Sequence, residues 1–407
     1  MPIAGQCRQI VKDDGISEII PVRMKLRLLL LACCLAAGLT HAGDLEAWKN
    51  ASKKSVAPDQ SRHSIHAYFN TCPESPDGKH VLYFTSATPE GEKGDLRILE
   101  RATGKETIIA DGITCEDAHR AACQQWSGGG KFVVYHTLTE GHWSVRAVEI
   151  ATKQERVLAM DRQLGFGSAT GKYAPVYGCH WNPGEHRNLE MIDVTTGEVT
   201  TPVTAEQTVA EYGDWIDKKL GSRDLTIFFP VVSPDESKVF FKPCIPGGGD
   251  SYKGMSVSKR DGKAIYDLAN RKFIRLVEQW GHPSWTPDSK GIFEKSNFVL
   301  EVGSGKTLPR YAPSCFSDHP TVSPDGSVFV TDADVTKRPF GKPGHWVIGI
   351  GSTTQDEFVV VDLFDNTKGA TSWRHNHPHP AFNSDGSRVY YNVNDGQWTR
   401  LMVAERK

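Results

Sequence analysis

The sequence has no excess of either charge and, after its first 42 residues, no long hydrophobic run. It carries 47 lysine and arginine residues against 49 aspartate and glutamate residues, a formal net charge of −2. Because proteins that bind nucleic acids normally present a basic face, this balance argues against a nucleic-acid partner. A helix needs about 20 consecutive apolar residues to span a bilayer. No segment after the first 42 residues approaches that length, which predicts no transmembrane span.

Several short motifs with known chemistry are also missing. There is no Cys-x-x-Cys pair, which argues against a zinc knuckle or a thioredoxin-like site. There is no Gly-x-Ser-x-Gly, which argues against a serine peptidase with that motif. No Lys-Ser or Lys-Thr pair follows Gly247–Gly249, so this run is a loop and not a phosphate cradle. The acidic residues are scattered, and they do not define a two-carboxylate glycosidase site.

The N-terminus looks like a targeting signal. Met24 begins a short basic region, and an apolar run follows from Leu28 to Leu39 before the small residue Ala42. This order is typical of a secretory signal peptide, so residues 1–42 are predicted to be an upstream extension plus a signal peptide starting at Met24. The mature protein would be periplasmic or secreted. Lipid attachment at Cys33 is an alternative, because the residues before it resemble a lipoprotein box.

Six cysteines remain after the predicted signal peptide, and this even number is compatible with disulfides in an exported protein. They are Cys72, Cys115, Cys123, Cys179, Cys244 and Cys315. Cys115 and Cys123 are close enough in sequence to bridge across a loop.

One turn signature recurs along the rest of the chain, and each copy leads into a β-rich run. The clearest copies read Ser-Pro-Asp-Gly, and the seven copies begin at residues 75, 127, 168, 233, 286, 323 and 383. Proline fixes φ and glycine tolerates a positive φ, so each copy predicts a tight hairpin turn. We therefore predict an all-β, seven-bladed β-propeller of four-stranded antiparallel blades, forming one domain over residues 43–407. A short helical insertion is expected near 205–220, and a β-sandwich is the alternative fold.

Three histidines occupy the same position in three successive copies. His282, His319 and His379 each lie six residues before the aspartate of their turn signature. Equivalent positions in a radial repeat face the same axis, so these imidazoles should converge, as they would at a metal or catalytic site. A duplicated structural His-Pro turn would give the same pattern without function. His375, His377 and His379 also alternate along the chain and would share one face of a strand, so at least two of them could bind one ion.

These motifs resemble those of the oligogalacturonate lyase family. The resemblance rests on His377-Pro-His379-Pro-x-Phe-x-x-Asp385-Gly and on the two upstream His-x-x-x-x-x-Asp copies. Members of that family are seven-bladed propellers with a divalent, typically manganese, ion, and the related ulvan lyases share the general chemistry. The resemblance implies an enzyme that cleaves uronate-containing oligo- or polysaccharides by β-elimination. It favours manganese as the cofactor, with zinc or calcium as alternatives.

The resemblance also implies a set of metal ligands. His319, His377 and His379 match the metal-binding histidines of the family. The fourth family ligand is a glutamine, and this chain has Arg374 at the corresponding place. Because arginine cannot ligate a cation, either His375, water or substrate completes the metal shell, or the metal is lost.

His282 matches the catalytic base of the family, whereas its catalytic arginine in blade four has no clear match. Lys253 is the nearest basic residue and the candidate for that role, with Arg260 further along the chain. A cation is required because the base removes the C5 proton next to an ionised carboxylate, and the charge that develops there must be neutralised. The ordinary pKa of histidine, about 6.5, suits the base.

A second group of polar and aromatic residues surrounds the second and third repeats. It suits a sugar cleft, in which aromatic rings stack on pyranose faces and basic side chains meet carboxylates. The candidates for substrate binding are His119, Arg120, Tyr135, His136, His180 and Arg374. The same residues could instead be structural.

The sequence is also compatible with two other functions. The Ser-Pro-Asp-Gly repeats also resemble TolB-like periplasmic propellers, so a non-catalytic propeller that binds a protein or glycan partner is the main alternative. A hydrolase built on the same scaffold is the third. A cluster of imidazoles around one ion would favour the enzyme, because a pure interaction propeller has no need for it.

Overall fold

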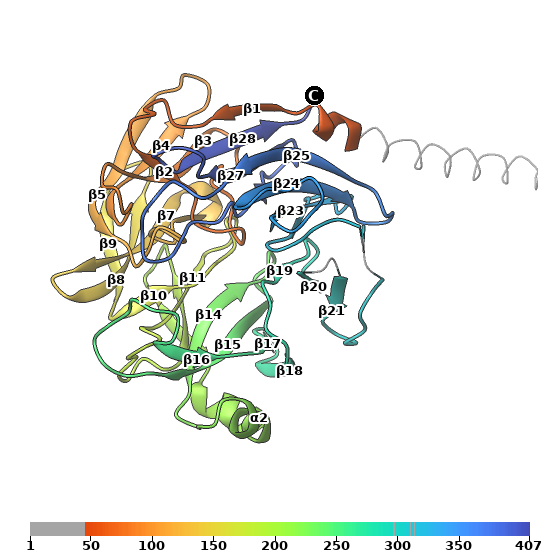
Figure 1. Ribbon diagram of the computed structural model, residues 1–407. Helices are drawn as coiled ribbons and strands as arrows, with labels where there is room; N and C mark the ends of the chain where they lie inside the picture. Colours follow the sequence, from red (N-terminus) through yellow and green to blue (C-terminus); the bar gives the residue numbers. More distant parts are fainter. Residues whose placement is uncertain (1–44, 296–297, 310, 313) are drawn as a thin grey trace, which may run out of the picture. The chain divides into compact units, whose positions relative to one another are not determined.

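Seven antiparallel β-sheets follow one another along the described part of the chain (Figure 1). A computed structural model describes residues 45–295, 298–309, 311–312 and 314–407. The sheets are the blades of a seven-bladed β-propeller, which confirms the predicted fold class. The predicted signal peptide, its start at Met24 and the alternative lipid site at Cys33 lie outside the described residues.

The first four blades contain most of the long strands. Blades one to three comprise β2 (His63–Ile65), β3 (His80–Ser86), β4 (Lys93–Glu100) and β5 (Glu106–Thr114); β6 (Gln125–Ser127), β7 (Phe132–Thr139), β8 (His142–Glu149) and β9 (Glu155–Met160); and β10 (Arg162–Leu164), β11 (Tyr173–Gly178), β12 (Leu189–Asp193) and β13 (Val199–Val203). Blade four comprises β14 (Thr226–Val232), β15 (Lys238–Pro246), β16 (Ser258–Arg260), β17 (Lys263–Asp267) and β18 (Lys272–Val277). Its extra strand, β16, pairs with β15.

Blade five departs from the expected four strands. It comprises β19 (Ser284–Trp285), β20 (Gly291–Glu294) and β21 (Phe298–Glu301). In the described residues its fourth strand is a single bridge between Leu300 and Thr307. Pro309, which has no N–H group to donate to a ladder, follows two residues later. Blades six and seven comprise β22 (Thr321–Val322), β23 (Val328–Asp334), β24 (His345–Ser352) and β25 (Phe358–Asp365); and β26 (Ala381–Phe382), β27 (Arg388–Val393), β28 (Arg400–Glu405) and β1 (Ser52–Ser55).

The turn signatures form hairpins through the side chains that define them. In blade one the Ser75 hydroxyl donates a hydrogen bond to the Asp77 carboxylate at 2.7 Å. The equivalent serines donate to Asp235 in blade four and to Asp325 in blade six. Gly78 has a φ of 72°, a left-handed conformation that would strain a residue with a side chain. The short-range chemistry of the signature therefore explains why its copies mark the blades.

The last blade is closed by a strand from the opposite end of the sequence. β1 pairs antiparallel with β28, with Ser52 opposite Glu405 and Ser55 opposite Met402 (Figure 1). Blade seven therefore takes three strands from the C-terminal part of the chain and its outer strand from the N-terminal part.

A buried carboxylate adds a second link between blades one and seven. The fully buried Glu74 side chain accepts two hydrogen bonds from the Arg388 guanidinium, at 2.8 and 2.9 Å. It also accepts bonds from the Asn383 amide, at 3.1 Å, and from the Tyr390 hydroxyl. Asn383, Arg388 and Tyr390 all belong to blade seven, so this one side chain anchors three residues of the closing sheet.

We expect Glu74→Ala to lower the free energy of unfolding by about 3 kcal/mol, because it removes one partner of a largely buried ion pair. Urea denaturation of the purified protein would measure this change. Glu46→Ala is the matched control, since Glu46 and Lys49 form an ion pair with both side chains 61% exposed, and such pairs contribute about 1 kcal/mol or less. Equal effects of the two substitutions would contradict a closing role for Glu74.

One long helix, α2 (Ala205–Lys219), occupies the segment for which the sequence predicts a helical insertion. Thr204 caps it: its hydroxyl accepts the N–H of Gln207, whose side chain accepts the N–H of Thr204. A short 3₁₀ turn, η1 (Gly128–Gly130), follows β6. No helix in the described residues has the length and apolar character needed to cross a membrane.

The disulfide considered between Cys115 and Cys123 is absent. Both remain thiols, as do Cys72, Cys179 and Cys244. Cys115 and Cys123 pack as small apolar side chains in two different hydrophobic clusters, which explains why they do not meet. Burial raises the pKa of Cys123 to about 12 and that of Cys244 to about 11, so these thiols stay protonated at neutral pH.

Candidate metal and catalytic site

Three buried or half-buried histidines bring their ring nitrogens together. One nitrogen of each of His119, His377 and His379 lies within 4.8 Å of the others. The ring centroid of His119 is 4.6 Å from that of His377 and 4.6 Å from that of His379. His119 lies in the connection from β5 to β6, and the other two lie just before β26. The sequence indicated His377 and His379 as ligands, but it placed His119 among the substrate-binding residues.

Hydrogen bonds orient one of these rings and leave the others without partners. Nδ1 of His119 donates to the backbone carbonyl of His375 at 2.8 Å, so its Nε2 is the nitrogen free to bind a ligand. Nδ1 of His377 and both ring nitrogens of His379 are buried with no hydrogen-bond partner among the described residues. The ring of His375 points to a different group, since its Nε2 bonds to the Asn366 carbonyl at 2.5 Å.

Burial keeps the three imidazoles neutral. It lowers the pKa of His377 to about 3 and holds the pKa values of His119 and His379 well below the ordinary value. The charge of Arg374 acts in the same direction on all three rings. A buried polar atom without a partner is costly, and a neutral imidazole is a common ligand of divalent transition metals. The donor set therefore fits a metal ion.

His319, the other predicted ligand, lies beside this cluster. Its ring centroid is 4.7 Å from that of His379. Nδ1 of His319 donates to the Asp332 carboxylate at 2.8 Å, which leaves its Nε2 buried and without a partner. Asp332 also accepts the backbone N–H of His379 at 3.0 Å. This carboxylate on β23 therefore orients two of the histidines, and no repeat or motif in the sequence singled it out.

His282 stacks on the outer side of the cluster. Its ring centroid lies 4.6 Å from that of His319, with 22° between the ring planes. Nδ1 of His282 is 3.8 Å from the Asp318 carboxylate, and the side chain is 25% exposed. Burial, with smaller effects of His319 and Lys242, lowers the pKa of His282 to about 4. At neutral pH this imidazole is unprotonated and able to accept a proton.

The basic residues indicated by the sequence differ in their partners. The Arg374 side chain is 23% exposed and lies 3.9 Å from the Asp117 carboxylate. Arg260 covers the ring of Phe228, with its guanidinium carbon 4.6 Å from the ring centroid. Lys253, the predicted catalytic cation, is 48% exposed and forms an ion pair with Glu92 at 2.8 Å. In the described residues Lys253 thus has the shorter ion pair, whereas Arg374 has a longer one with Asp117.

Several predicted substrate-binding residues form a buried network around one carboxylate. Arg120 donates to Glu116 at 2.9 Å, and Nε2 of His180 lies 3.8 Å from the same carboxylate. Although burial opposes it, the neighbouring Arg120 and His180 hold the pKa of Glu116 below its ordinary value. Nε and Nη1 of Arg120 are buried without a partner in the described residues. The network sits next to the histidine cluster, because His119 and Arg120 are consecutive.

The remaining two candidates lie deeper in the structure. Nδ1 of His136 accepts the backbone N–H of Leu164 at 3.1 Å, and its side chain is buried. Tyr135 belongs to the hydrophobic cluster that contains Trp126, and its hydroxyl bonds to Glu155 on β9. Each therefore has a structural partner of its own.

Two aromatic residues lie directly against the histidines. The ring centroid of Tyr68 is 4.4 Å from that of His379, and the centroid of Phe69 is 5.0 Å from that of His319. Phe69 also lines a cavity of about 470 Å³, whose other walls come from the turn-signature ends of several blades. Phe69 therefore contacts the histidines on one side and lines this 470 Å³ cavity on the other. No repeat pattern indicated that role for Phe69.

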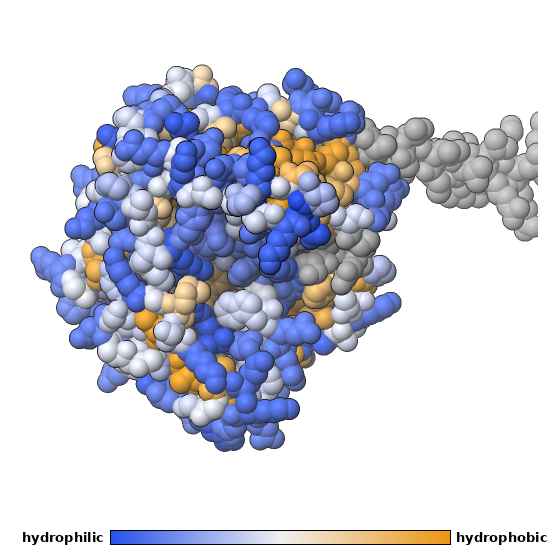
Figure 2. Space-filling model, in the orientation of Figure 1, coloured by the Kyte–Doolittle hydropathy of each residue, from blue (hydrophilic) through white to orange (hydrophobic). Residues whose placement is uncertain are grey.

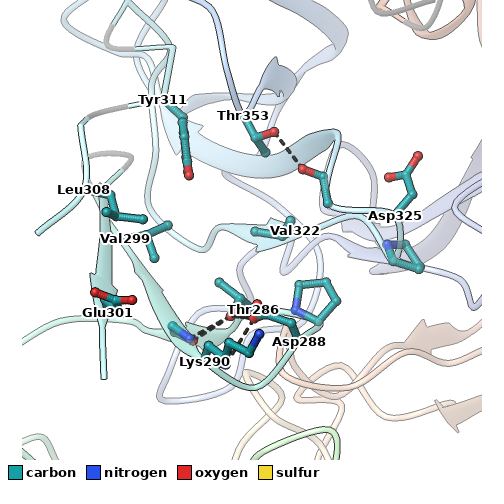
Figure 3. A pocket seen from close by; sticks show the side chains of 14 residues that line it. Thr286, Asp288, Lys290, Val299, Glu301, Leu308, Tyr311, Val322, Asp325 and Thr353 are labelled. Atoms are coloured by element: carbon teal, nitrogen blue, oxygen red, sulfur yellow. Dashed lines mark hydrogen bonds between the residues drawn. The ribbon is translucent and has the colours of Figure 1, made fainter. Parts of the chain in front are cut away.

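A further cavity, of about 530 Å³, lies between blades five and six (Figure 3). Its walls include Thr286, Asp288 and Glu301 on one side and Tyr311 and Thr353 on the other (Figure 3). None of the predicted site residues lines it. The face of the molecule drawn in Figure 2 is mostly hydrophilic and is hollowed near its centre.

Comparison with known proteins places the fold but not the function. No family model matches the chain, and no curated protein matches it either. Among solved structures, the chain is similar to an oligogalacturonate lyase in complex with manganese, with 15% identity, 88% of this chain and 94% of that chain covered, and a TM-score of 0.59.

Two other solved structures were also found to be similar. An oligogalacturonate lyase from Vibrio parahaemolyticus is 13% identical, with 87% of this chain and 96% of that chain covered and a TM-score of 0.56. TolB from Acinetobacter baumannii is 12% identical, with 77% and 76% covered and a TM-score of 0.40. At these identities the likeness shows the propeller fold alone.

Proposed function

We propose that this protein is a lyase that cleaves uronate-containing oligo- or polysaccharides by β-elimination. The observation that carries the proposal is the cluster of neutral imidazoles of His119, His377 and His379, with unpartnered ring nitrogens and with His282 nearby. The fold shared with oligogalacturonate lyases supports it. The signal-peptide pattern of residues 1–42 supports a further part of the proposal, export to the periplasm or the cell exterior.

In this proposal His119, His377 and His379 would hold a divalent ion, with manganese favoured over zinc or calcium. Nε2 of His319 is the next nitrogen available, whereas the ring of His375 is engaged by Asn366. A bound ion supplies positive charge that stabilises the charge developing on the substrate carboxylate. The protein's own part is to fix the ligands, and the Asp332 carboxylate does this for His319 and His379.

His282 acts as the base. Its Nδ1 faces Asp318, which favours a proton on that nitrogen and leaves Nε2 to take the C5 proton of the uronate. The C5–H and C4–O bonds break, the C4–C5 double bond forms, and the leaving oxygen takes a proton from water. Asp318 then stabilises the imidazolium that results, as an acidic partner does for a catalytic histidine.

We assign the cationic contact with the substrate carboxylate to Arg374, with Arg260 as its neighbour. The charge of Arg374 helps to lower the pKa values of His119 and His379, so this guanidinium contributes positive potential at the triad. Lys253 would first have to release Glu92, so it fits this role less well. Arg120 and His180 both contact the Glu116 carboxylate, and in this proposal they would help to bind the substrate from that network.

The test is the ultraviolet absorbance of the purified protein mixed with pectate fragments, ulvan, alginate or glycosaminoglycans. We expect one of these polymer classes to give rising absorbance, because elimination creates a C4–C5 double bond conjugated to the carboxylate. A chelator should abolish the signal, and added manganese should restore it. His142→Ala is a matched control that should keep full activity, since His142 is 62% exposed and bonds to Asp161. A metal-loaded protein that leaves every polymer intact would overturn the proposal.

A further inference from the structure

An exposed tryptophan stands next to the candidate base. Trp280 lies in the connection from β18 to β19 and is 46% exposed, which is unusual for such a large apolar side chain. Its ring centroid is 6.3 Å from that of His282, with 72° between the ring planes. Trp280 was not among the site residues indicated by the sequence, because it lies two residues before the repeated segment that begins at His282. A group lying on the open indole surface would be beside the imidazole of His282.

A buried lysine holds the indole from the protein side. The amine of Lys242 on β15 lies 3.3 Å from the centroid of the Trp280 ring. It also donates a hydrogen bond to the carbonyl of Gly281 at 3.0 Å, so it fixes both the ring and the backbone beside it. Lys242 itself is only 4% exposed. One face of the indole is therefore covered by the Lys242 amine, and the exposed area of Trp280 is left for another partner.

The amine beneath Trp280 has no carboxylate partner. No carboxylate of the described residues lies within ion-pair distance of Lys242, whereas its neighbour Lys263 pairs with Glu294. Burial lowers the pKa of Lys242 well below its ordinary value, and the contacts that hold its amine are the Trp280 ring and the Gly281 carbonyl. Packing alone would be served by an apolar side chain at this position. The arrangement makes sense if its task is to hold Trp280 in one orientation at the surface.

We propose that Trp280 is a sugar-binding platform: its exposed face stacks on a pyranose ring of the substrate, and Lys242 is the positioning residue that holds the indole for this contact. The electron-rich face of an aromatic ring attracts the polarised C–H groups on the face of a pyranose. A uronate stacked there lies beside His282, so the platform selects substrates whose ring presents such a face next to the scissile bond. This subsite rests on the proposed function, because it uses His282 as the reference point.

Measuring binding separately from turnover tests the sugar-binding platform independently of the lyase reaction. In the His282→Ala background, which should not turn over, trigalacturonate would be titrated calorimetrically into the Trp280 variants. Oligomers from ulvan and alginate would serve as parallel probes. We expect Trp280→Ala to weaken binding of the preferred oligomer about tenfold, as truncation of a central aromatic contact commonly does, and Trp280→Phe to weaken it less. Lys242→Met should weaken binding by a smaller factor, because the indole remains but is no longer held.

Phe340→Ala is the matched control, since Phe340 is also 46% exposed but packs against Phe316 and makes no ring contact with these histidines. It should leave affinity unchanged. With His282 present, Trp280→Ala should raise KM much more than it lowers kcat. Unchanged affinity in Trp280→Ala, or no binding of any uronate oligomer to the protein, would overturn the platform. Binding that depends on Trp280 without any double-bond formation would overturn the lyase proposal and leave the platform standing.

Discussion

Replacing His379 with alanine should remove the bound metal and lower kcat on the preferred uronate polymer about 10³-fold, the upper range for loss of one electrostatic contact to a transition state. Both ring nitrogens of His379 are buried without a hydrogen-bond partner, and one of them belongs to the triad with His119 and His377. Alanine leaves only two imidazoles of the triad. Metal content measured by mass spectrometry, together with the rate of double-bond formation, would report both effects.

The backbone around His379 should survive this substitution. His379 has a φ of 49°, a conformation that costs energy for any residue with a Cβ atom, so alanine neither relieves nor adds strain. Its backbone N–H keeps its hydrogen bond to Asp332. Thermal unfolding of the variant without metal should therefore match that of the chelated wild type. A variant with an unchanged metal content would show that the triad is not the metal site.

Replacing His282 with alanine should lower kcat by about 10²–10⁴-fold, the usual contribution of a general base, without lowering the metal content. The reason is that His282 stacks on His319 but lies outside the triad of ring nitrogens. Steady-state kinetics and metal analysis on the same preparation would separate this variant from His379→Ala, in which both quantities fall.

A matched control exists for the second substitution. His345→Ala removes an imidazole whose one hydrogen-bond partner among the described residues is the carbonyl of Pro343, and it should leave both quantities unchanged. A His282→Ala protein with wild-type kcat would require a different base. Loss of metal in His282→Ala would show that His282 supports the ligands rather than the proton transfer.

The blades could be predicted because their signal is local. A serine or threonine that bonds to an aspartate two residues later, as Ser75 does to Asp77, makes the same turn wherever it occurs. The convergence of His319 with His379 follows from the same repeat, since equivalent positions face one axis. Non-local contacts carry no such signal: Lys253 was named only as the nearest basic residue in the sequence, and nothing local indicated its ion pair with a glutamate of blade one.

The roles and residues that the sequence missed share a physical cause, and His119, indicated as a substrate-binding residue, is one of them in its role beside the other histidines. His119 lies in a connection between blades, a segment with no counterpart in the other repeats, so only the folded chain brings it to His377. Asp332 and Lys242 act through contacts with distant segments, and each looks like an ordinary strand residue in the sequence. In the described residues the fourth strand of blade five is a single bridge, where the pattern of the other blades predicted a full strand.

The pairing of β1 with β28 decides when the ring can close during folding. These strands stand at opposite ends of the described chain, so their contact has nearly the largest sequence separation the protein allows. The entropy lost on closing so long a loop grows only logarithmically with its length, whereas high contact order slows folding strongly. Blades one to six have their strands from consecutive segments and can form as each is synthesised. The seventh must wait for β28, and until then β1 and β27 present open strand edges on which another chain could pair.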